Sequence, residues 1–134
     1  MNLWKLSLAG TGAVLVLASC GGGGGSSNNG GGSGCTPSGG AASGTTAAQT
    51  VKINSDPNTV GAYAPQSVSV KVGDSVEWDW VDSSAQHSVS ADDSSFESCL
   101  QSSGSKFVVT FSKAGDFKYH CQIHSGMIGD VKVS

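Results

Sequence analysis

The chain has 134 residues, of which 37% are hydrophobic and 13% are charged, and its formal net charge at pH 7 is −3. Its basic residues are all lysines and none of them form a cluster, which argues against nucleic-acid binding. The length and the 20 glycines favour one small domain accompanied by low-complexity sequence.

The first segment, residues 1–19, is predicted to be a signal peptide of the lipoprotein type. Lys5 supplies a positive charge, and residues 6–18 form an apolar run that is too short to span a bilayer stably. The run ends in Leu-Ala-Ser-Cys, which resembles a bacterial lipobox. We therefore expect lipidation of Cys20 and export to a bacterial membrane, on its periplasmic or cell-surface side. The alternative is an ordinary signal peptide with an incidental cysteine.

The second segment, residues 20–49, is predicted to be a flexible tether. It is rich in Gly, Ser, Thr and Ala and has almost no charge, so it cannot bury enough apolar surface to offset its ordering entropy. About 30 flexible residues have a root-mean-square span of about 30 Å. Such a tether suits a domain that must reach its partners above a membrane.

The third segment, residues 50–134, is predicted to form one all-β domain. Val68, Val70 and Val72 alternate with polar residues, as expected for a strand with one buried face. Short alternating runs separated by Gly, Asp and Ser indicate a β-sandwich of about seven or eight strands. The strands are expected at 51–53, 67–72, 75–81, 86–90, 107–111, 116–121 and 128–133.

Four metal-binding side chains stand out in this domain. Cys121 ends the strand predicted at 116–121 with its side chain inward, and His124 and Met127 follow on one short loop. His87 lies on a different strand. Two imidazoles, one thiolate and one thioether are the ligands of a blue-copper electron-transfer site, a trigonal His₂Cys centre with a weak axial Met.

The pattern Tyr-His-Cys-x₂-His-x₂-Met at 119–127 and the Gly-Asp-Ser-Val-Glu-Trp run at 73–78 resemble the cupredoxins, and amicyanin most of all. The resemblance covers roughly residues 50–134. It implies a Greek-key β-sandwich, a single type 1 copper ion and electron transfer without catalysis. The implied ligands are His87, Cys121, His124 and Met127.

The sequence departs from the family at two positions near this site. Ser88 follows His87, where the family usually has an Asn whose side chain ties the ligand loops together. Phe117 stands four residues before Cys121, where the family usually has a Tyr that bonds to nearby backbone. Both departures predict a ligand loop that is braced less firmly than in the relatives.

The remaining cysteines suggest a disulfide. If Cys20 is lipidated and Cys121 is a ligand, Cys35 and Cys99 are left over from the four cysteines of the chain. In an exported domain such a pair favours a disulfide, and two free thiols are the alternative.

We therefore expect a monomeric, membrane-anchored electron carrier that exchanges one electron with redox protein partners and is not an enzyme. An oxidase or nitrite-reductase fragment is disfavoured, because Gln122 replaces the second His of a His-Cys-His motif and the chain has only three His. A copper store or chaperone on the same fold is the alternative function. A further alternative is a metal-free β-sandwich with an adhesion function, but it would not explain the spacing of the four metal-binding residues.

Overall fold

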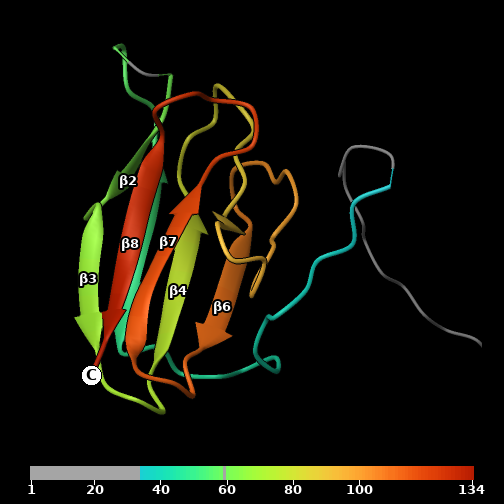
Figure 1. Cartoon of the computed structure of the whole chain (residues 1–134). Helices are drawn as coiled ribbons and strands as arrows, with labels where there is room; N and C mark the ends of the chain where they lie inside the picture. Colours follow the sequence, from blue (N-terminus) through green and yellow to red (C-terminus); the bar gives the residue numbers. More distant parts are fainter. Residues whose placement is uncertain (1–33, 59) are drawn as a thin grey trace, which may run out of the picture.

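The computed structural model describes residues 34–58 and 60–134, and within these ranges the protein is an all-β sandwich (Figure 1). Eight strands form two four-stranded sheets, in the orders β2-β1-β4-β6 and β3-β8-β7-β5. The predicted fold class is therefore confirmed. The strands are β1 (Gln49–Asn54), β2 (Ala62–Ala64), β3 (Ser67–Val70), β4 (Ser75–Trp80), β5 (Ser90–Ala91), β6 (Lys106–Thr110), β7 (Gly115–His120) and β8 (Ile128–Val133). No helix in these ranges is long and apolar enough to cross a bilayer.

Two parallel strand pairs bring together segments that are far apart in the sequence. β1 runs parallel to β4, with Val51 opposite Trp78, and β3 runs parallel to β8, with Val68 opposite Val131. The remaining strand pairs are antiparallel. The long β7–β8 pairing is the one that matters for the site, because its connecting loop carries three of the four candidate ligands.

The core is built from the alternating inward side chains of both sheets. Along β4 the buried positions include Val76, Trp78 and Trp80, as the period-2 pattern predicts. Trp78 meets Tyr119 of the opposite sheet edge-on, with ring centroids 5.3 Å apart. Trp80 donates a hydrogen bond from Nε1 to the backbone carbonyl of His87 at 2.8 Å, so a core residue also fixes the position of a candidate ligand.

The strand predicted at 86–90 is wrong in its extent. β5 comprises only Ser90–Ala91, and His87 makes an isolated bridge with Gln101. Two backbone hydrogen bonds, at 3.1 and 2.9 Å, hold that bridge. The backbone N–H groups of Ser88 and Val89 donate to the side chains of Cys121 and Ser98 and not to a neighbouring strand, so a longer strand does not form here.

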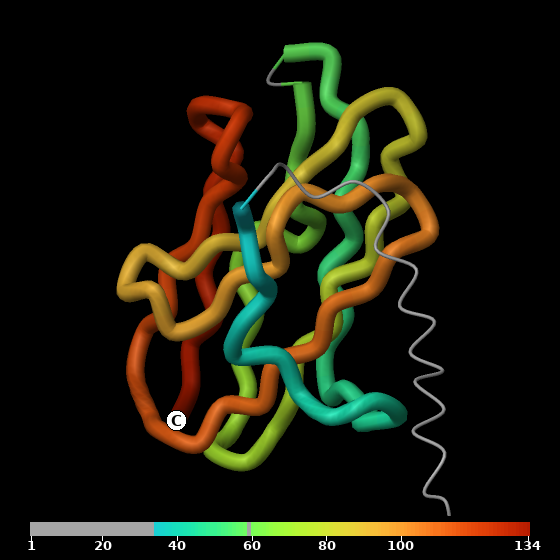
Figure 2. The backbone as a smooth tube through the Cα atoms, turned by 90° about the vertical axis from the view of Figure 1, so that its right-hand side faces the viewer, coloured from blue at the N-terminus to red at the C-terminus, as the bar shows by residue number. Residues whose placement is uncertain are grey.

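Part of the segment predicted as a tether packs against the sandwich (Figure 2). Cys35 is joined to Cys99 by a disulfide that closes a sequence separation of 64 residues. Ser38 and Glu97 exchange two backbone hydrogen bonds of 2.9 and 3.0 Å, and Ala41 donates one of 2.7 Å to Val108. We call residues 35–48 the N-terminal arm. The predicted signal peptide, the lipidation site Cys20 and the first part of the tether lie outside the described residues.

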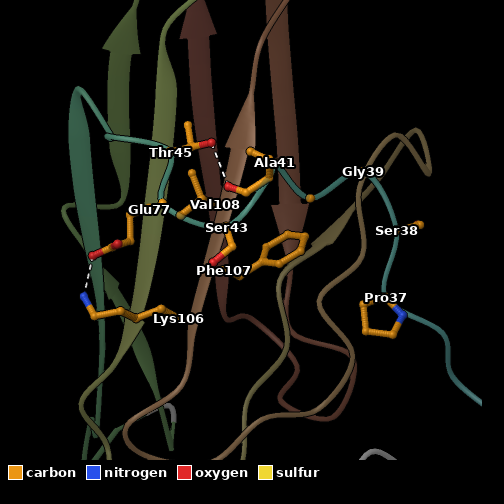
Figure 3. Close-up of a pocket in the computed structure, with 13 residues that line it drawn as sticks. Pro37, Ser38, Gly39, Ala41, Ser43, Thr45, Glu77, Lys106, Phe107 and Val108 are labelled. Atoms are coloured by element: carbon orange, nitrogen blue, oxygen red, sulfur yellow. Dashed lines mark hydrogen bonds and ion pairs between the residues drawn. The ribbon is translucent and has the colours of Figure 1, made fainter. Parts of the chain in front are cut away.

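The arm approaches the sandwich closely because one of its residues has no side chain. A Cβ at Gly39, whose φ is +70°, would lie 2.3 Å from the carbonyl oxygen of Ser95. Between the arm and β6 lies an open hollow lined by residues such as Thr45, Glu77 and Lys106, of which the last two form an ion pair (Figure 3). The lining of this hollow includes none of the candidate copper ligands.

Candidate metal centre

The candidate ligands gather at the end of the sandwich opposite the C-terminus, in the connections between strands (Figure 1). Cys121 follows the last residue of β7, and the loop returns to β8 directly after Met127. Two backbone hydrogen bonds close this loop, from Cys121 N to the carbonyl of Met127 at 3.0 Å and from Met127 N to that of His124 at 3.2 Å. His87 comes from the connection between β4 and β5.

Three of the four predicted ligands converge directly. One donor atom from each of His87, Cys121 and His124 lies within 4.8 Å of the other two. The two Nδ1 atoms are 3.0 Å apart, and Cys121 Sγ is 3.5 Å from His124 Nδ1. His87 and Cys121 are buried, whereas His124 is partly exposed. Cys121, directly after the end of β7, has its sulfur turned inward toward the other donors, as the alternation along the preceding strand predicts.

Met127 completes the set from the side of the β1–β2 connection. Its side chain is buried, and its sulfur and the His87 ring face the same backbone position, Gly61. A Cβ at Gly61 would lie 2.9 Å from Met127 Sδ and 2.3 Å from His87 Cε1. A residue larger than glycine would therefore push both side chains out of place. Sequence reasoning missed Gly61, which lies 26 positions before His87 and carries no functional group.

A buried carboxylate holds His87 from behind. Asp82 Oδ2 lies 2.7 Å from His87 Nε2, and both side chains are almost completely buried. Ser84 donates two hydrogen bonds to Oδ1, from its backbone N at 2.7 Å and from its Oγ at 2.6 Å. The hydrogen bonds from Ser84 and His87 lower the pKa of Asp82 to about 2, although burial opposes this. Sequence reasoning missed Asp82 as well.

Ser88 braces the ligand loop despite its short side chain. Its Oγ accepts a hydrogen bond of 2.9 Å from Gln122 N, and its own N donates one of 3.4 Å to Cys121 Sγ. Its carbonyl accepts a bond of 2.5 Å from the hydroxyl of Tyr63. The connection between the two ligand segments that sequence reasoning doubted is therefore made, because the backbones approach closely enough for a serine to reach.

The structure also shows the positions of His120 and Phe117, two residues of β7 near the site. His120 lies on the outside of β7, where it contacts Asp92 at 2.7 Å, in agreement with its predicted orientation away from Cys121. Phe117 replaces the usual Tyr and packs on Phe111, with ring centroids 5.0 Å apart. Phe117 has no hydroxyl, so it makes no hydrogen bond through its side chain.

The donor set fits a soft, redox-active ion. A thiolate and a thioether select copper in preference to hard cations, and imidazole suits both copper oxidation states. Asp82 contacts Nε2 of His87. Nδ1 is therefore the nitrogen that points toward Cys121 and His124. The same combination of two imidazoles, one thiolate and one thioether is the donor set of a type 1 copper centre.

Comparisons with known proteins agree with this class. The family described as copper binding proteins, plastocyanin/azurin family, matches residues 49–134. A chloroplastic plastocyanin of Tetradesmus obliquus is 30% identical over 98 residues, which cover 64% of this chain and 67% of the plastocyanin. The chain belongs to the plastocyanin/azurin family of copper-binding proteins, and its cofactor is one copper ion.

Solved structures show the same relationship. A purple cupredoxin from Nitrosopumilus maritimus superposes with a TM-score of 0.56 at 26% identity, covering 64% of this chain and 99% of that protein. The Cu(I) form of an amicyanin mutant superposes with a TM-score of 0.52 at 25% identity, covering 63% of this chain and 82% of that protein. The matched part corresponds in size to the sandwich described above.

Proposed function

We propose that this protein is a one-electron carrier that shuttles electrons between redox protein partners and catalyses no reaction itself. The cofactor supplies a Cu(I)/Cu(II) couple when bound. The chain's own residues hold the ligand set in one geometry. His87 is fixed by Asp82, Cys121 receives a hydrogen bond from Ser88 N, and the loop is closed on both sides. A rigid site changes little when the charge of the ion changes, which favours rapid electron exchange.

The observation that carries this proposal is the unequal exposure of the ligands. His87, Cys121 and Met127 are buried, while the imidazole of His124 reaches the surface. Next to it, Ile123 is 52% exposed, and at the start of β8 Ile128 is 55% exposed. At this end of the sandwich the donor set is buried, and one ligand edge is open beside apolar side chains. Such a surface suits brief docking of another redox protein.

The test is electron self-exchange, because it requires no identified partner. We expect Ile123→Lys to slow electron exchange between the Cu(I) and Cu(II) forms, because the two introduced lysines would repel each other when two copies of the protein dock. The visible spectrum should stay unchanged. The control is Val72→Lys, which makes the same charge change at a valine of similar exposure in the turn after β3, away from the ligand loop. Equal slowing by both substitutions would place the docking surface elsewhere.

A copper store or chaperone on the same fold is the alternative, and the same experiment separates it from the carrier. A carrier exchanges electrons rapidly in the wild type and shows an intense thiolate-to-Cu(II) absorption band. A store would bind copper with a weak band and exchange electrons slowly. The position of Ser88 and Asp82 around the ligands supports the carrier, because both residues restrict the movement that metal release would need.

We further propose that the domain is exported, anchored to a bacterial membrane through lipidated Cys20 and monomeric. The Leu-Ala-Ser-Cys run supports the anchor, and the Cys35–Cys99 disulfide suits an oxidising compartment. The test is expression of the full chain followed by membrane fractionation and mass measurement. We expect a lipid-modified chain that begins at Cys20 in the membrane fraction, and a Cys20→Ala chain without that mass. An unmodified wild-type chain in the soluble fraction would refute the anchor.

A further inference from the structure

We propose that Asp82 is a positioning residue of the copper site, which selects the ligating nitrogen of His87 and biases the site toward Cu(II). This inference rests on the copper-carrier function and assigns a role to a residue outside the ligand set. The contact that carries it is the 2.7 Å approach of Asp82 Oδ2 to His87 Nε2, in a place where both side chains are almost completely buried.

The contact with Asp82 fixes which nitrogen of His87 carries a proton. A carboxylate only accepts hydrogen bonds, so Nε2 of His87 must carry the proton that it donates to Asp82. In a neutral imidazole the other nitrogen, Nδ1, is then unprotonated and has a free lone pair. Nδ1 is the atom that lies 3.0 Å from His124 Nδ1, on the side of the donor set. Asp82 therefore prepares His87 for metal binding before any metal arrives.

Asp82 is itself held in place by several hydrogen bonds. Both carboxylate oxygens accept hydrogen bonds: Oδ1 accepts two from Ser84, and Oδ2 accepts one from His87 Nε2. The Asp82 backbone N is also held, through a bond of 2.9 Å to the carbonyl of Ile53 in β1. The carboxylate is thus fixed to the sheet, and the ring of His87 takes its orientation from a rigid group.

The negative charge of Asp82 also acts on a bound ion. The Asp82 carboxylate is buried in a region of low dielectric, and only the imidazole ring of His87 separates it from the metal position. Solvent therefore screens its charge weakly. Its negative charge favours the more highly charged state of a bound ion. It also makes the imidazole a better donor, as carboxylate–histidine pairs do at other metal sites. Both effects stabilise Cu(II) more than Cu(I), so they lower the reduction potential.

The experiment compares two Asp-to-Asn substitutions. Asp82→Asn keeps the size of the side chain, removes the charge and can present either an acceptor or a donor to His87. Asp92→Asn is the matched control, because Asp92 makes a contact of the same length, 2.7 Å, with His120 on the exposed side of β7. Each variant is measured for Cu(II) and Cu(I) affinity, reduction potential and, in the metal-free state, the tautomer of His87 by nitrogen-15 NMR.

We expect Asp82→Asn to lose about 10–100-fold in Cu(II) affinity, the usual range for removal of an outer-shell partner. The loss in Cu(I) affinity should be smaller, so the reduction potential should rise, and the metal-free protein should show a mixture of His87 tautomers. The control should keep wild-type values. Equal behaviour of the two variants in affinity and potential would overturn the proposal and leave Asp82 a purely structural residue.

The NMR measurement keeps this proposal separate from the proposed function. If the wild type bound no copper, the carrier function would fail, yet the tautomer of His87 would still report on Asp82. A wild-type His87 protonated at Nδ1 would refute the positioning role regardless of copper. Thermal unfolding of the metal-free Asp82→Asn variant checks that the fold is retained.

Discussion

At the scale of single residues, the chemistry of the site depends on short polar contacts behind the ligands. Ser88 illustrates this, because its hydroxyl and its backbone N contact the loop that begins at Cys121, while its carbonyl accepts a hydrogen bond from Tyr63 of β2. The serine therefore connects to the ligand loop with a shorter side chain than the family's Asn.

We predict that Ser88→Ala destabilises the metal-free protein by about 1–3 kcal/mol, because Gln122 N loses its hydrogen-bond acceptor in a partly buried place. The copper affinity of the Ser88→Ala variant should also fall. Urea unfolding of the metal-free protein and copper titration measure the two effects. Ser103→Ala, in an exposed loop, is the control. Unchanged stability and affinity in Ser88→Ala would show that the hydroxyl does not brace the loop.

The sequence predicts the ligands better than their supports, for a physical reason. Cys121, His124 and Met127 lie within seven residues at the end of one strand, so their spacing alone brings them to one place. Asp82 and Gly61 act through the path of the backbone in irregular connections. No periodic pattern in the sequence reports that path.

At the scale of elements, the N-terminal arm is the main difference between sequence and structure. Its composition predicts a tether, and composition cannot register two backbone hydrogen bonds between Ser38 and Glu97 or the close packing at Gly39. The strand predictions succeed where side chains alternate, as in β4 and β7. They fail at 86–90, where the ordering of the backbone comes from tertiary hydrogen bonds to Gln101.

We predict that the double variant Cys35→Ser, Cys99→Ser lowers the free energy of unfolding by about 2–4 kcal/mol, because the disulfide closes a loop of 64 residues and restricts the unfolded chain. The visible spectrum of the copper form should persist, since neither sulfur belongs to the donor set of His87, Cys121 and His124. Urea unfolding and absorption spectroscopy measure the two results. A variant as stable as the wild type would show that the arm contributes little to folding.

At the scale of the whole molecule, the ligand end couples stability to pH. Burial, and then the neighbouring His87, lower the pKa of His124 in the metal-free protein. The folded state therefore binds a proton at His124 less readily than the unfolded chain, where a histidine has a pKa of about 6.5. The stability of the metal-free protein is unaffected by this group above that pH. It should decline as the pH falls below about 6.5 and level off below the lowered pKa.

We expect the urea midpoint of the metal-free protein to be lower at pH 5 than at pH 7.5 and this difference to shrink in His124→Gln. Asp82, with a pKa of about 2, stays ionised throughout this window and does not contribute. His120→Gln is the control, because His120 lies on the outside of β7. A wild-type midpoint that stays constant between the two pH values would contradict the burial argument.

The central claim is that Cys121 supplies a thiolate to a type 1 copper ion, together with His87, His124 and Met127. The measurement that tests it most directly is the visible absorption spectrum of the Cu(II)-loaded protein and of its Cys121→Ser variant. The account predicts an intense thiolate-to-Cu(II) band in the wild type and the loss of that band in the variant, with the sandwich still folded. A wild-type Cu(II) form without the band, or a variant that retains it, would contradict the account.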